Sequence, residues 1–125
     1  MKVTENEMIV YVDVDGTLCV KGEEIDGRDV PGGYQGDQAY YYGVLHRIDR
    51  LYLNIAFLKT LKARGWYIVV HSHNGWQWAK NVVEALELQN YVDEVKSKPF
   101  KYVDDQDCHS WMGTRINLHE EKESW

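Results

Sequence analysis

Apolar runs alternate with amphipathic stretches along this chain, and their order predicts the fold class. Residues 8–12 (M-I-V-Y-V) and 66–72 (W-Y-I-V-V-H-S) are largely continuous apolar runs, which is typical of strands covered on both faces of a parallel sheet. Residues 51–64 and 76–88 instead repeat apolar residues at helical spacing, and Gly65 is a stop signal after the first of them. This alternation predicts an α/β protein with right-handed crossovers.

The remaining segments add shorter elements to this plan. Residues 91–95, 100–105 (F-K-Y-V-D-D) and 114–118 predict three further strands. Residues 19–50 are rich in glycine and contain three consecutive tyrosines, so we expect a short flap or hairpin followed by an irregular, substrate-facing loop. A chain of 125 residues fits one domain, residues 1–125, and leaves no room for a large cap.

Composition and charge narrow the class of protein. The formal net charge of −6 argues against sequence-independent attraction to nucleic acid, which requires a basic face. No apolar stretch approaches the roughly 18 residues of a membrane span, and the first seven residues are polar. We therefore expect a cytoplasmic protein without membrane contact. Cys19 and Cys108 have neither zinc-site nor disulfide-framework spacing, which predicts reduced thiols.

Polar groups collect where the predicted strands end. Six such residues follow or close these strands: Asp13, Asp15, Ser72, Lys98, Asp104 and Asp105. Open parallel sheets bind ligands beyond the carboxyl ends of their strands, so we expect these residues to gather at one edge. Several carboxylates in one place repel each other unless a cation lies among them. Mg²⁺ prefers carboxylates, water and a substrate phosphate, so Asp13, Asp15, Asp104 and Asp105 predict a magnesium site.

The same residues predict a reaction. Asp13 can attack phosphorus and carry the phosphoryl group, while Asp15 faces the same way, protonates the leaving oxygen and later takes a proton from water. Only one of these two acids should be ionised at the start. Ser72, His73 or Asn74 could cap the helix that follows. At the N-terminus of that helix, Ser72 can bind a phosphate oxygen. Lys98 supplies positive charge where negative charge accumulates.

Four short motifs in this order resemble the haloacid dehalogenase (HAD) superfamily of phosphotransferases. D-V-D-G-T-L at 13–18 matches its first motif, and Ser72 at the end of an apolar strand matches its second. Lys98-Pro99 matches the third, and the acidic pair in K-Y-V-D-D matches the fourth. Together the motifs span residues 8–107. The resemblance implies a capless, three-layer Rossmann-like domain with a central, mostly parallel sheet and a short flap after its first strand.

The resemblance also implies roles for individual residues. Asp13 would be the nucleophile and Asp15 the general acid and base. Mg²⁺ would be held by Asp13, the Val14 carbonyl and one of the last acidic pair. Because only five residues separate Lys98 from that pair, Lys96 and Lys101 are alternative working lysines.

These observations lead to a functional prediction with open alternatives. We expect a Mg²⁺-dependent phosphatase that hydrolyses a phosphomonoester through an aspartyl-phosphate, with a nucleotide or a nucleic-acid end phosphate as candidate substrates. One alternative is a catalytically silent regulatory module that binds metal and phosphate. Another is a phosphotransferase whose acceptor is not water.

Histidines and arginines near these motifs are given no catalytic role. His46, Arg47 and Arg50 precede the first predicted helix and are interpreted as exposed helix charges. His71 and His73 lie at strand spacing, but without a cysteine or a third histidine nearby they are interpreted as pocket wall or surface.

Overall fold

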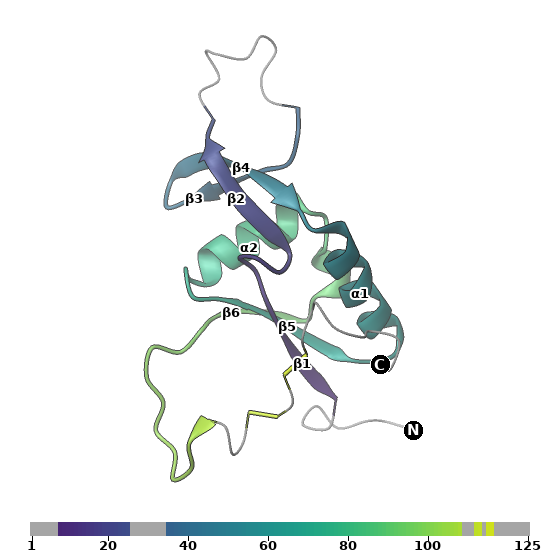
Figure 1. Ribbon diagram of the computed structural model, residues 1–125, viewed down its shortest axis with the longest axis vertical. Helices are drawn as coiled ribbons and strands as arrows, with labels where there is room; N and C mark the ends of the chain where they lie inside the picture. Colours follow the sequence, from purple (N-terminus) through teal and green to yellow (C-terminus); the bar gives the residue numbers. More distant parts are fainter. Residues whose placement is uncertain (1–7, 26–34, 109–111, 114, 117–125) are drawn as a thin grey trace.

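The computed structural model describes residues 8–25, 35–108, 112–113 and 115–116. Three strands form its parallel sheet: β1 (Ile9–Asp13), β5 (Tyr67–Ser72) and β6 (Glu94–Ser97). Their order is β1-β5-β6 (Figure 1). Asp13 pairs with His71 and His71 pairs with Lys96, so all three strands end at one edge. The mixed α/β class that the sequence predicts is confirmed, with a small parallel sheet.

Two helices follow the predicted pattern closely. They are α1 (Tyr52–Ala63) and α2 (Trp76–Ala85). Gly65 lies just beyond α1 with a φ of +91°, a left-handed conformation that glycine adopts without a Cβ penalty. The apolar stripes of both helices are buried: Ile55, Leu58, Leu61, Ala79, Val82 and Val83. Neither helix, in the part of the chain that the structure describes, is long and apolar enough to cross a membrane.

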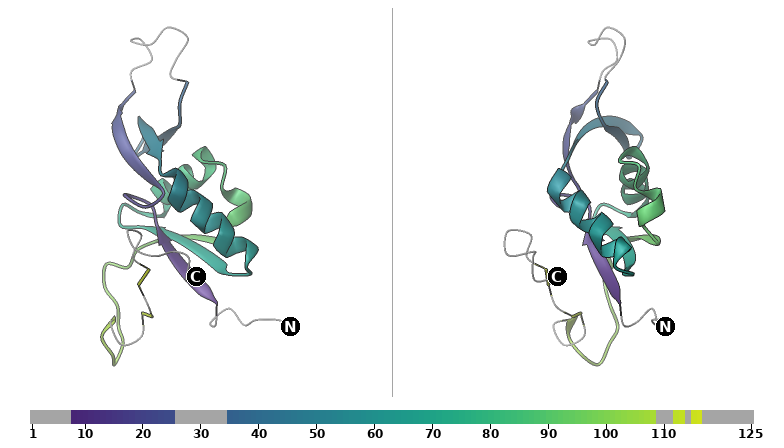
Figure 2. Two further views of the ribbon diagram at one scale, coloured as in Figure 1. Left: turned by 45° about the vertical axis from the view of Figure 1, so that its right-hand side comes forward. Right: turned by 90° about the vertical axis from the view of Figure 1, so that its right-hand side faces the viewer.

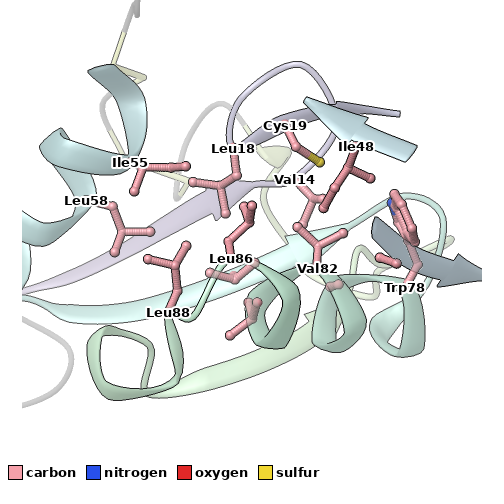
Figure 3. Close-up of a cluster of buried hydrophobic side chains, with 14 of the residues drawn as sticks. Val14, Leu18, Cys19, Ile48, Ile55, Leu58, Trp78, Val82, Leu86 and Leu88 are labelled. Carbon is pink, nitrogen blue, oxygen red and sulfur yellow. The ribbon is translucent and has the colours of Figure 1, made fainter. Parts of the chain in front are cut away.

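Both helices pack on the same face of the parallel sheet. Figure 3 shows part of the buried cluster between helices and sheet. Side chains from alternate strand positions belong to this cluster or pack against it: Val10, Val12, Ile68, Val70 and Val95. Within the described residues no helix covers the opposite face (Figure 2). Tyr11, on that face, is 49% exposed. The expectation that the first strand is covered on both faces is therefore wrong, and a three-layer Rossmann-like fold is not confirmed.

A second, antiparallel sheet follows β1 in the chain. Its strands are β2 (Cys19–Glu24), β3 (Gln38–Tyr41) and β4 (Val44–Arg50), in the order β2-β4-β3. It lies beside α2 at one end of the molecule (Figure 1). The described part of residues 19–50 contains a hairpin, β3–β4, as one of the two expected forms, and β2 joins this hairpin in a sheet in which Ala39 and Ile48 are buried. Residues 26–34 lie outside the described residues.

The basic residues before α1 belong to this sheet and not to a helix. Arg50 donates from Nε and Nη2 to the two Asp37 carboxylate oxygens at 2.7 and 2.8 Å. This contact raises the pKa of Arg50 further above its ordinary value. His46 Nδ1 lies 2.9 Å from the Gly22 carbonyl across the sheet. The interpretation of His46, Arg47 and Arg50 as exposed helix charges is therefore wrong: they lie on β4.

The chain after α2 departs most from the prediction. A short 3-10 helix, η1 (Gln89–Tyr91), comes first, so β6 begins later than the strand predicted for residues 91–95. Residues 100–105 form no strand, because their apolar side chains find no core: Phe100 is 90% exposed and Val103 fully exposed. Of the strand predicted for residues 114–118, only 115 and 116 are described, and neither is in a strand.

Candidate functional site

Three strands end at one edge of the parallel sheet, and four predicted site residues meet there. Asp13 is the last residue of β1, Ser72 is the last residue of β5, and Lys98 follows β6. The Lys98 backbone N–H donates to the Ser72 carbonyl at 2.9 Å, which holds the chain after β6 beside β5. Asp15 lies two residues beyond β1 and receives a hydrogen bond from Ser72 at 3.1 Å.

Asp13 forms an ion pair with a lysine. Lys98 Nζ lies 3.2 Å from Asp13 Oδ1, and about a third of each side chain is exposed. Such an exposed pair contributes little to stability, but it places a positive charge beside a carboxylate that solutes can reach. Lys96 Nζ lies instead 3.8 Å from Glu94 Oε1, and Lys101 is exposed in the loop after β6. Of the three candidate lysines, the described contacts favour Lys98 as the partner of Asp13.

A tight turn separates Asp15 from β1. The Val14 carbonyl accepts three backbone N–H groups, at 3.1, 2.9 and 3.3 Å, from Thr17, Leu18 and Cys19. Gly16 has a φ of +79° in this turn, which a residue with a side chain rarely adopts. Because a carbonyl oxygen has two lone pairs, the Val14 oxygen is fully occupied. The expectation that it ligates Mg²⁺ does not fit this geometry.

The Asp15 carboxylate is held at both of its oxygens. Oδ2 accepts hydrogen bonds from Ser72 Oγ at 3.1 Å and from Asn74 Nδ2 at 3.0 Å. Oδ1 accepts one from Trp78 Nε1 at 3.0 Å. Trp78 itself is 2% exposed and lies at one end of the buried cluster (Figure 3). Residues from β5, the following turn and α2 therefore fix the orientation of this carboxylate.

Ser72 is buried beneath the site and does not face solvent. Its exposed fraction is 0%, and its hydroxyl donates to Asp15 while accepting the Asn74 backbone N–H at 3.0 Å. In the described conformation this hydroxyl orients Asp15. A direct contact between Ser72 and a phosphate oxygen would require these bonds to open.

The start of α2 is capped from another strand. Its N-cap residue is Gly75, which has a φ of +102° and no side chain to offer. The Trp76 backbone N–H donates instead to Ser97 Oγ at 2.8 Å. The prediction that Ser72, His73 or Asn74 caps this helix is wrong, because the turn at Gly75 places the first helical residue against β6.

Sequence reasoning missed three residues of this site: Asn74, Trp78 and Tyr41. Tyr41 Oη donates to Asn74 Oδ1 at 3.3 Å, and its ring packs edge-on against Trp78 with centroids 5.2 Å apart. A signal for Trp78 was present, since a tryptophan on the apolar face of a helix needs a partner for its N–H. The sequence alone does not show that this partner is Asp15.

The second acidic pair lies apart from the first. Asp104 and Asp105 are exposed in the loop after β6, which extends away from the body of the protein (Figures 1 and 2). Asp104 Oδ1 accepts the Gln106 backbone N–H at 3.0 Å. The described residues contain no group of three or more acidic, histidine or cysteine side chains that could hold a metal ion. The four-carboxylate magnesium site is thus not assembled in this conformation.

Burial and the charges of the site shift the pKa values of two neighbouring side chains, Cys19 and His71. Burial raises the pKa of the Cys19 thiol to about 12, and the charges of Asp15 and Asp13 add to the effect. This thiol stays protonated and is not a nucleophile at neutral pH. Burial and the Lys98 ammonium lower the pKa of His71, although Asp13 opposes them. His71 is therefore neutral at neutral pH and adds no positive charge to the edge.

Comparison with known proteins adds no relative: no family profile, curated protein or solved structure matches this chain.

Proposed function

We propose that this protein is a phosphomonoester hydrolase that forms an aspartyl-phosphate on Asp13. The observation that carries the proposal is the meeting of Asp13, Asp15 and Lys98, from two strand ends and a turn, at the edge where parallel sheets bind ligands. A reachable carboxylate beside an ammonium supplies a nucleophile and a charge for the phosphoryl oxygens. The resemblance of the four motifs to the HAD superfamily supports the same roles.

The reaction would proceed in two steps. An Asp13 carboxylate oxygen attacks phosphorus, and the bond to the leaving oxygen breaks with its electron pair staying on that oxygen, which takes a proton from Asp15. Water then attacks phosphorus, Asp15 takes a proton from that water, and phosphate leaves with Asp13 regenerated. The Lys98 ammonium faces the negative charge of the phosphoryl oxygens throughout. Protons and charges balance over the cycle.

Mg²⁺ remains part of the proposal, with Asp13 and either Asp104 or Asp105 as its ligands, because the Asp15 oxygens already accept hydrogen bonds from Ser72, Asn74 and Trp78. It would neutralise charge on the phosphoryl group. Binding requires the loop after β6 to approach the sheet edge. The exposed Phe100 and Val103 support such an approach, because apolar side chains gain free energy when they leave water.

A second candidate function is a module that binds phosphate without turnover. This function is favoured because the predicted catalytic side chains already form hydrogen bonds within the protein. Ser72 is buried, and both Asp15 oxygens accept hydrogen bonds from other residues. Such a module would bind inorganic phosphate or a phosphomonoester at Lys98 and release no product.

Phosphate release from a panel of compounds tests the first function against the second. The panel holds nucleoside monophosphates, sugar phosphates, p-nitrophenyl phosphate, a phosphopeptide and a 3′-phosphorylated oligonucleotide, each with Mg²⁺ or EDTA. We expect release by the wild type, loss in Asp13→Asn, and unchanged release in Asp49→Asn, whose side chain is about half exposed on β4. Binding without release would favour the module. Loss of substrate without inorganic phosphate would indicate transfer to another acceptor.

A further inference from the structure

The hydrogen bonds around Asp15 occupy its two oxygens unequally. A carboxylate oxygen offers about two lone-pair directions. Oδ2 accepts two hydrogen bonds, from Ser72 and Asn74, so both of its directions are used. Oδ1 accepts one, from Trp78 Nε1, and keeps one direction free among the described contacts. A proton carried by Asp15 therefore belongs on Oδ1.

The Asn74 amide can point only one way in this arrangement. Asp15 Oδ2 is an acceptor, so the Nδ2 end of the amide faces it, and Tyr41 Oη donates to Asn74 Oδ1 at 3.3 Å at the other end of the amide. Tyr42 Oη donates to the Asn74 carbonyl at 2.8 Å and anchors the same residue through its backbone. If the amide were turned round, its oxygen would face the Asp15 carboxylate and its N–H₂ would face a hydroxyl that now donates to it.

These tyrosines come from the second sheet, where Tyr41 ends β3 and Tyr42 begins the turn to β4. Tyr42 has a φ of +49°, unusual for a residue with a large side chain, and its hydroxyl reaches within 3.6 Å of where a Gly75 Cβ would lie. Tyr41 packs edge-on against Trp78 and carries the Lys21 ammonium 4.0 Å from its ring centroid. The β3–β4 hairpin thus contacts two of the three donors to Asp15, Asn74 and Trp78, from a sheet outside the parallel one.

An ordinary structural role explains part of this network. A buried indole N–H needs a partner, and Trp78 would destabilise the core without one. That role does not require the partner to be a carboxylate. It also does not require two more donors on that carboxylate, or a tyrosine that fixes the direction of one of them.

We propose, on the basis of the proposed function, that Asn74 and Trp78 are positioning residues. They hold Asp15 so that Oδ1 carries the proton to the leaving oxygen, and Tyr41 maintains that geometry by fixing the Asn74 amide. The second sheet is thereby part of the catalytic apparatus, although none of its residues touches the reacting atoms.

The test uses the chemistry of the leaving group. p-Nitrophenolate departs without a proton, whereas the alkoxide of a nucleoside 5′-monophosphate needs one, so a defect in proton delivery affects the alkyl ester selectively. Trp78→Phe removes the N–H and makes the buried ring smaller, but it keeps an aromatic ring against Tyr41. Tyr41→Phe removes only the hydroxyl. Matched controls are Trp66→Phe, just before β5, and Tyr40→Phe, exposed on β3 next to Tyr41.

We expect Trp78→Phe to lower kcat/KM for the nucleoside monophosphate by about 10- to 100-fold, a part of what general acid catalysis contributes. Because kcat/KM reports only the first step, in which the leaving group departs, kcat/KM for p-nitrophenyl phosphate should fall less than about 3-fold. Tyr41→Phe should show the same selectivity at about 3- to 10-fold. Both controls should match the wild type.

Three outcomes would overturn the proposal. Equal losses on the two esters would mean a structural role alone, and the absence of any loss would mean that Asp15 needs no positioning; the proposed hydrolase survives both results. If the wild type releases phosphate from no compound of the panel, the proposed function fails and the positioning role fails with it. Should Trp78→Phe unfold, as judged by circular dichroism, the peripheral Tyr41→Phe decides the question.

Discussion

Two acidic pairs follow apolar runs in this chain, and the structure treats them differently. Asp13 and Asp15 come after β1, where Lys98, Ser72, Asn74 and Trp78 supply partners at 3.0 to 3.2 Å. Asp104 and Asp105 come after F-K-Y-V, which stays outside the core and leaves both acids exposed. Similar local sequences therefore have different surroundings.

The cause of the difference is whether a neighbouring strand is present. β1 pairs along its whole length with β5, whose apolar residues 68–70 are buried, and this pairing fixes the direction of the chain as it leaves the sheet. Residues 100–105 follow Pro99, which cannot donate a backbone hydrogen bond, and they pair with no described strand. An apolar run followed by acids becomes a site only where the run is held in a sheet.

The largest expected contrast is in activity. Asp15→Asn should lower kcat for an alkyl phosphomonoester by about 10²- to 10⁴-fold, because it removes the proton donor and points an amide at three other donors. Asp104→Asn and Asp105→Asn should leave kcat at saturating Mg²⁺ nearly unchanged, while one of them raises the Mg²⁺ concentration needed for half activation by at least about 10-fold. Kinetics over a Mg²⁺ titration provide the measurement. An Asp15→Asn enzyme as active as the wild type would contradict the roles given to the two pairs.

A second contrast is in stability. Leu58→Ala, in the buried stripe of α1, should reduce the free energy of unfolding by about 2–5 kcal/mol, because it removes buried carbon and leaves a cavity. Val103→Ala should change it by no more than about 0.5 kcal/mol, because that side chain is fully exposed. Urea denaturation measures both. A comparable loss in Val103→Ala would mean that the loop after β6 packs against the protein in solution.

The buried Cys19 predicts a dependence of stability on alkaline pH. The folded thiol, with its pKa raised to about 12, stays protonated where the unfolded thiol, with an ordinary pKa of 9.0, has lost its proton. Its contribution is complete below pH 9 and is lost between pH 9 and about 12, at up to about 1.4 kcal/mol per pH unit. Cys19→Ala should therefore lose less stability than the wild type between pH 8 and 10.5 in urea denaturation. Equal losses of stability in Cys19→Ala and the wild type would exclude a contribution of the Cys19 thiol to alkaline destabilisation.

The smallest effect is expected at acid pH, from His71. Its pKa is lowered in the folded state, so below about pH 6.5 the unfolded chain binds a proton that the folded protein does not. Stability should fall as the pH drops through this range, and less in His71→Gln. Unfolding midpoints at pH 7 and pH 5.5 measure the difference. If the wild type instead gained stability relative to His71→Gln between pH 7 and pH 5.5, this prediction would be contradicted.

The sequence predicts the segments whose patterns are reinforced by neighbours. The helices and the strand at residues 66–72 follow their apolar periodicity, and D-V-D-G-T-L singles out Asp13 and Asp15 by residue type and spacing alone. Residues 100–105 have a strand-like pattern, but strand formation depends on a partner that local sequence does not specify. The pattern in residues 19–50 does not reveal the sheet there, in which β2 pairs with β4 across more than twenty residues of chain.

The candidate site likewise contains residues that the sequence predicts and residues whose role depends on tertiary packing. Asp13 and Lys98 could be predicted because the motifs name them and strand ends bring them together. Asn74, Trp78 and Tyr41 could not, because their part in the site depends on the packing of the second sheet against α2. Ser72 lies at the sheet edge, as its position at the end of an apolar run predicts, but its hydroxyl faces Asp15 in a buried setting.

Trapping of the covalent intermediate tests the central claim most directly. An acyl phosphate is reduced by borohydride to an alcohol, so acid-quenched enzyme in turnover should yield homoserine in place of Asp13, detected by peptide mass spectrometry. We predict homoserine at position 13 in the wild type with substrate, and none without substrate or in Asp13→Asn. Steady turnover with homoserine at another aspartate, or at none, would contradict the account of Asp13 as the phosphoryl acceptor.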